Sequence, residues 1–138
     1  MWLHDPDHVA HIAGNLVALA VVGSVVEPVI GSSRLVALYL AAGLGGAGMH
    51  WLVQPHAEAA LVGASGGITG LMAVSAVVRP RLMLAFAVSY MAMNVLGLFV
   101  STPLTPPGTS LACHVGGFTC GVAAVLLAEA RGVRWVVA

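Results

Sequence analysis

The stretch Leu-Val-Gly-Ala-Ser-Gly-Gly-Ile-Thr-Gly, residues 61–70, sets Ser65 among small residues at the start of a long apolar run. Glycines remove side-chain bulk from a helix surface and let a neighbouring helix approach closely. We therefore expect Gly63, Gly66 and Gly70 to be helix-packing residues. Taken alone, the stretch is explained by packing, so any chemistry at Ser65 depends on what other segments bring to it.

The composition indicates a membrane protein. Of the 138 residues, 59% are hydrophobic and 7% are charged, with a mean hydropathy of +1.00, whereas about 25% of residues are charged in ordinary soluble domains. The net charge is zero, which leaves no basic surface for nucleic acid.

Five apolar runs approach the length of about 20 helical residues that crosses the hydrocarbon layer of a bilayer. They lie near residues 9–29, 35–53, 59–78, 82–101 and 111–129. Unpaired backbone groups are costly in lipid, so each run should be a helix. We predict an all-α, multi-pass membrane protein with five transmembrane helices.

The basic residues predict the orientation in the bilayer. All five are arginines that follow the first, third and fifth runs: Arg34, Arg79, Arg81, Arg131 and Arg134. If the chain reverses direction at every helix, these positions share one side, which the positive-inside rule makes cytoplasmic. The N-terminus lacks the pattern of a removable signal peptide. A bacterial plasma membrane is the simplest setting for such a chain.

Two further segments carry polar groups near the outer ends of helices. His11 and Asn15 are spaced i, i+4 and share a helix face, although interhelical hydrogen bonding alone would explain the pair. His114 opens the last helix, with Gly117 and Gly121 on the same face. That glycine-lined face can lie against the glycines beside the serine.

The first, third and fifth helices run in parallel, so His11, Ser65 and His114 should lie at similar depth. A serine hydroxyl becomes nucleophilic when a neighbouring base takes its proton, and His114 is the candidate base. Acyl transfer also needs donors for the developing oxyanion, which His11, Asn15 and the backbone N–H of Ser65 can supply. Because the sequence places no carboxylate obviously beside His114, we predict a dyad rather than a triad.

Three motifs in this order on alternate helices resemble the rhomboid family of intramembrane serine proteases: His11-x-x-x-Asn15, Gly63-Ala64-Ser65-Gly66 and His114-x-x-Gly117-x-x-x-Gly121. Glu27-x-x-x-Gly31, after the first helix, is also similar to the family pattern. The resemblance covers the chain from about His4 to Ala128.

The resemblance implies a helical bundle with a hydrophilic cavity open to the outer side, which cleaves transmembrane segments of other proteins. It implies Ser65 as nucleophile, His114 as general base, and His11 and Asn15 as oxyanion donors, with no metal or organic cofactor. The family core has six helices, and this chain begins at what resembles the second. We therefore expect residues 1–138 to be one rhomboid-like transmembrane domain, truncated at its N-terminus relative to that core.

Two other functions compete with proteolysis. A non-catalytic relative would bind and escort transmembrane helices, but such relatives typically lose the serine or the histidine, and this chain keeps both. A small transporter or metal-binding protein would use the outer histidines, among them His4 and His8. No second cluster with ligand spacing completes a metal site in the sequence.

Overall fold

The computed structural model describes residues 6–56, 64–96, 99–100 and 109–133, and residues 6–8 by their backbone alone. Every regular element in these ranges is an α-helix, and the predicted all-α fold with five helices is confirmed. The helices are α1 (Pro6–Ile30), α2 (Ser32–Val53), α3 (Ser65–Val78), α4 (Pro80–Leu96) and α5 (Leu111–Ala130).

Single residues connect two pairs of helices. Gly31 separates α1 from α2 and adopts a φ of 81°, a left-handed conformation that glycine reaches without the steric cost of a Cβ atom. Arg79 separates α3 from α4, and Pro80 begins α4, as proline favours the first position of a helix. Across the first of these turns, Glu27 Oε1 accepts a hydrogen bond of 2.6 Å from Ser32 Oγ.

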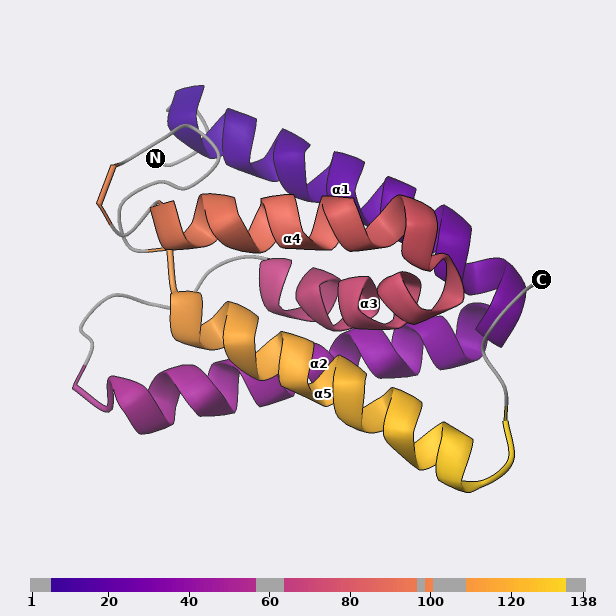
Figure 1. The fold of residues 1–138 in the computed structure, drawn as a ribbon. Helices are drawn as coiled ribbons and strands as arrows, with labels where there is room; N and C mark the ends of the chain where they lie inside the picture. The colour runs from indigo at the N-terminus through magenta and orange to yellow at the C-terminus, as the bar shows by residue number, and fades with distance from the viewer. Residues whose placement is uncertain (1–5, 57–63, 97–98, 101–108, 134–138) are drawn as a thin grey trace.

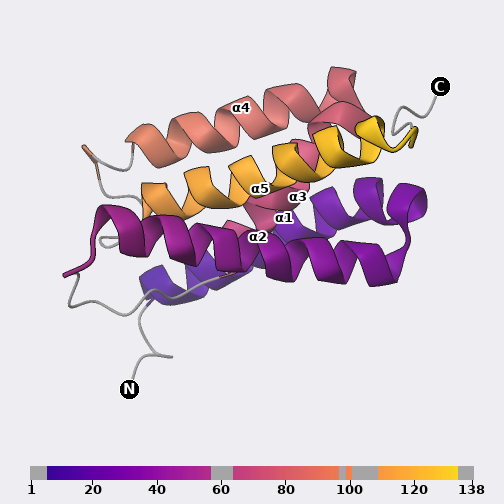
Figure 2. The same ribbon diagram turned by 90° about the horizontal axis from the view of Figure 1, so that it is seen from below.

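The helices α1, α3 and α5 run in the same direction and α2 and α4 run against them (Figure 1). The parallel arrangement required for a common depth is therefore present. Seen from below, α3 lies behind α5 and α2, in the middle of the bundle (Figure 2). It packs against all four other helices, and nearly all of its side chains are buried.

Three helices, α1, α2 and α5, are long and apolar enough to span a bilayer, whereas α3 and α4 are shorter apolar helices. The third run was predicted from residue 59, but the described helix begins at Ser65; the fourth was predicted as 82–101, but α4 covers Pro80–Leu96. At about 1.5 Å per residue, the 14 residues of α3 cover about 21 Å, less than the roughly 30 Å hydrocarbon layer. We therefore expect the start of α3 to lie deeper in the bilayer than the neighbouring ends of the longer helices α1, α2 and α5.

The backbones of α3 and α5 meet at two pairs of glycines. A Cβ atom on Gly117 would collide with the carbonyl oxygen of Gly66, and one on Gly121 would collide with the carbonyl oxygen of Gly70. These four residues were expected to pack helices together. Gly63, the fifth glycine of that prediction, lies outside the described residues.

An adjoining side of α5 packs on glycines of α2. A Cβ atom on Gly46 would meet the Cys113 carbonyl oxygen at 2.6 Å, and one on Gly45 would collide with Cys120 Sγ. Both cysteines are free thiols. They fill space between α2 and α5, so α5 is held closely on two sides.

Gly121→Ala is expected to lower the free energy of unfolding by about 1–3 kcal/mol, the usual cost of overpacking a tight contact. The added methyl group would meet the Gly70 carbonyl, which belongs to the backbone and cannot rotate away. Gly48→Ala on α2 is the control, because a Cβ atom there meets nothing within 4 Å. Unfolding in detergent micelles, followed by circular dichroism, compares them. An equal effect of both substitutions would contradict the close contact of α3 with α5.

Candidate active site

Ser65 and His114 lie together where α3 and α5 begin. Ser65 is the first residue of α3, and His114 lies in the first turn of α5. His114 Nε2 is 2.7 Å from Ser65 Oγ, within hydrogen-bond distance. The two residues are only 7% and 2% exposed. The structure therefore brings the predicted nucleophile and base into direct contact.

The N-terminus of α3 has no side-chain cap. Ala64 occupies the N-cap position and makes no capping hydrogen bond. The first N–H groups of a helix have no acceptor within that helix, and the Ser65 N–H is one of them. These N–H groups point out of the N-terminal end of α3. Their partial positive charge makes this end of the helix favourable for a negative charge.

The N-terminus of α5 is capped instead. Ser110 Oγ accepts a hydrogen bond of 3.1 Å from Cys113 N and shares a second, of 2.7 Å, with His50 Nδ1 near the end of α2. This pair of bonds ties the start of α5 to α2. Since His114 lies in the same first turn, the cap also fixes the position of the candidate base.

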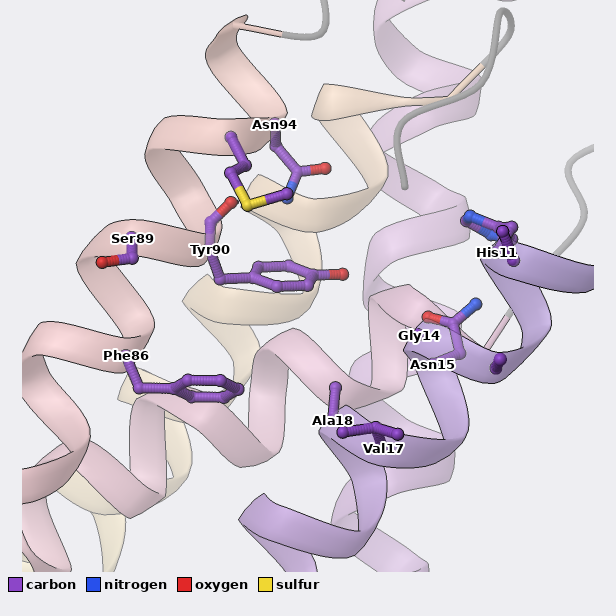
Figure 3. A pocket seen from close by; sticks show the side chains of 12 residues that line it. His11, Gly14, Asn15, Val17, Ala18, Phe86, Ser89, Tyr90 and Asn94 are labelled. Carbon is purple, nitrogen blue, oxygen red and sulfur yellow. The ribbon is translucent and has the colours of Figure 1, made fainter. Parts of the chain in front are cut away.

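A cavity of about 450 Å³ opens between α1 and α4. Its α1 wall carries both predicted oxyanion residues, His11 and Asn15, and Figure 3 shows Phe86 and Tyr90 reaching toward them from α4. The remaining lining residues are Ala10, Ala13, Gly14, Val17, Ala18, Ser89, Met93 and Asn94. Most of this lining is apolar, so the hydrophilic character implied for the cavity is not found here.

The Ser65–His114 pair and the cavity are neighbours. Ser65 and His114 are not among the residues that line the cavity, whereas His11 and Asn15 are. Tyr90, which lines the cavity, lies against the His114 ring and so connects the two places. The structure thus joins Ser65 to His114 directly and places the two α1 residues on an adjoining wall.

Tyr90 belongs to both places. It lines the cavity, and its ring lies edge-on to the His114 ring, with 5.9 Å between the centroids and 61° between the planes. No motif in the sequence indicates a role for Tyr90, which is one tyrosine within an apolar helix. Only the placement of α4 beside α3 shows which residue its ring meets.

No metal site is evident in the part of the chain that the structure describes. No group of three or more His, Cys, Asp or Glu side chains there is placed to hold an ion. His4 and the side chain of His8, considered above as ligands, lie outside the described part.

Comparison with known proteins identifies one family. The model of the Rhomboid domain matches residues 1–131. No solved structure matches the chain.

Three curated relatives match about half of the chain. Over 72 residues the chain is 36% identical to RHOMBOID-like protein 5 of Arabidopsis thaliana, a match that covers 52% of the chain and 23% of that relative. It is 42% identical over 64 residues to Rhomboid protease GluP of Bacillus subtilis (strain 168), covering 46% and 12%. It is 41% identical over 69 residues to Rhomboid-like protein 11, chloroplastic, of Arabidopsis thaliana, covering 50% and 24%. The matches thus span a quarter or less of these relatives.

Ser110→Ala is expected to lower the free energy of unfolding by about 1–2 kcal/mol, because it removes the cap of α5 and the bond to His50. Ser24→Ala is the matched control, since Ser24 Oγ bonds only the Val21 carbonyl of its own helix and is exposed. Thermal unfolding in detergent micelles measures both variants. If the control loses as much stability as Ser110→Ala, the cap does not hold α5 in place.

Proposed function

Because the chain belongs to the rhomboid family, we propose that it is an intramembrane serine endopeptidase, with Ser65 as nucleophile and His114 as general base. The observation that carries this proposal is the 2.7 Å contact between Ser65 Oγ and His114 Nε2. A base at this distance can take the hydroxyl proton as the oxygen attacks. Helix packing alone does not require that the serine at the start of α3 contact the histidine in the first turn of α5.

The reaction follows from the two groups. Ser65 Oγ attacks the carbonyl carbon of a peptide bond while His114 Nε2 accepts the hydroxyl proton. The tetrahedral intermediate collapses, the C–N bond breaks, and His114 returns the proton to the leaving amine. Water, activated by the same imidazole, then hydrolyses the ester on Ser65 and restores the hydroxyl.

Three donors are candidates for stabilising the oxyanion. The Ser65 N–H lies at the uncapped start of α3, and His11 and Asn15 project from one face of α1 into the cavity. Each donor aimed at an oxyanion contributes about 3 kcal/mol to stabilising the transition state. We propose that the substrate carbonyl oxygen lies between these two helices during attack.

The substrate class follows from the surroundings. The chain is an integral membrane protein of the rhomboid family, and the cavity beside the dyad has mainly apolar walls. We propose that it receives a transmembrane segment of another protein from the lipid bilayer. Small residues on the α1 wall, Gly14 and Ala18 among them, leave room for an extended backbone.

We propose that the dyad lies near the outer face of the membrane, because Arg34, Arg79 and Arg131 occur at the opposite ends of the helices. The relatives come from a bacterium and a plant. They therefore do not favour a bacterial plasma membrane over a plant membrane.

Ser65→Ala and His114→Ala are each expected to reduce labelling by a fluorophosphonate probe to background in native-like membranes. The probe needs no known substrate, since it reacts with an activated serine. Ser75→Ala is the matched control on the same helix, where Ser75 Oγ bonds the Met72 carbonyl, and His56→Ala controls for loss of an exposed histidine.

Labelling that survives in Ser65→Ala would show that another residue reacts. A folded wild-type protein that is not labelled would overturn the protease proposal and favour a protein that binds and escorts transmembrane helices, whose binding would not require the Ser65 hydroxyl.

Asn15→Ala is expected to slow labelling by about 100-fold to 1,000-fold while leaving Ser65 in contact with His114, since removal of one oxyanion donor has an effect of this size. Labelling rates measured at several probe concentrations separate slower chemistry from weaker binding. An unchanged maximal rate would exclude Asn15 as a donor.

A further inference from the structure

A second cavity, of about 460 Å³, lies between the end of α2 and the start of α5. No described residue lines both this cavity and the one between α1 and α4. Val115 of α5 lines the second cavity and is 41% exposed, whereas its neighbour His114 is buried beside Ser65. The second cavity therefore opens on a different side of α5 from the Ser65–His114 contact. We call it the α2–α5 groove.

The lining of the α2–α5 groove is divided into an apolar and a polar part. Met49 and Val53, one turn apart on α2, and Val115 on α5 contribute apolar side chains. Gln54, directly after α2, and Thr109, two residues before α5, contribute polar side chains. The groove is thus apolar along the two helices and polar where they end.

The surroundings place this division at the boundary of the bilayer. Both α2 and α5 are long and apolar enough to span a membrane, and the end of α2 extends past the start of α5 (Figures 1 and 2). Trp51, in the last turn of α2, is 65% exposed. Tryptophan is enriched where the hydrocarbon layer meets the lipid headgroups. The polar part of the groove is therefore expected at headgroup level, with the apolar part beside the acyl chains.

The groove is short. From Met49 to Val53 α2 rises about 6 Å, at about 1.5 Å per residue, which is about a fifth of the roughly 30 Å hydrocarbon layer. Below this level the two backbones touch, because a Cβ atom on Gly116 would meet the Gly45 carbonyl oxygen at 2.7 Å. A partner helix would contact the groove over little more than one turn. A flexible acyl chain needs no longer contact than this.

We propose that the α2–α5 groove binds one glycerophospholipid from the leaflet that contains the starts of α3 and α5. Its acyl chain lies against Met49, Val53 and Val115, and its ester oxygens accept hydrogen bonds from the Gln54 amide and the Thr109 hydroxyl. These polar side chains are neutral, so binding does not require a charged headgroup. The site uses neither Ser65 nor His114, so the proposal does not depend on proteolysis.

Bound lipid is expected to stabilise the start of α5. Ser110 also lines the groove, and its Oγ accepts the hydrogen bond from Cys113 N and contacts His50 Nδ1. A lipid in the groove would cover this cap. A ligand that binds only the folded protein raises its unfolding temperature, which supplies a readout besides binding itself.

The test measures lipid binding to the full chain in dodecyl maltoside, with added 1-palmitoyl-2-oleoylphosphatidylcholine, by native mass spectrometry. Val53→Trp and Val115→Trp fill the groove from its two walls. Each should lower affinity for the lipid by about 10-fold or more, since losing the burial of about two methylene groups has an effect of this size. The added lipid should raise the unfolding temperature of wild type but not of these variants.

Each helix offers a matched control. Val36→Trp on α2 and Val122→Trp on α5 replace valines that are 52% and 39% exposed and do not line the groove. Both controls should bind the lipid as wild type does. Circular dichroism checks that all four variants keep their helices.

Three results would overturn the lipid site. Folded wild-type protein could carry no phospholipid adduct, or the groove variants and the controls could bind the lipid equally. A second copy of the chain, bound by wild type and lost in both groove variants, would instead make the groove an interface between copies.

Discussion

The close approach of two backbones, those of α3 and α5, is the contact on which the rest of this structure depends. Gly117 lies against the Gly66 carbonyl and Gly121 against the Gly70 carbonyl, one turn further along. In lipid, helices gain little from burying apolar side chains, because the tails are equally apolar, so close packing supplies much of the association. A hydrogen bond of 2.7 Å between Ser65 and His114 can form only where the two helix axes are this close.

The site combines strongly and weakly held parts. The serine and histidine lie on helices packed through glycines, and α5 is additionally tied to α2 by Ser110 and His50. The ring beside the histidine comes from α4, which borders a cavity. Such a division suits the proposed protease, which would hold its reacting atoms in place and admit a transmembrane segment as substrate.

The sequence was informative where a feature depends on local pattern. Five apolar runs gave five helices, and the glycine spacing around Ser65 and after His114 predicted a contact at the faces where Gly66 and Gly70 of α3 lie against Gly117 and Gly121 of α5. The remaining features depend on packing between helices. Nothing in the apolar run of α4 distinguishes Tyr90 from a lipid-facing aromatic residue, and the apolar walls of the cavity arise from α1 and α4 together.

The shortness of α3 also bears on how the chain enters the membrane. A helix of 14 residues is too short to be held in a bilayer by itself, since about 20 residues span it. Only Arg79 separates it from α4. Insertion during synthesis is therefore expected to deliver α3 and α4 together as a hairpin, with α3 sheltered from lipid only after α5 has followed.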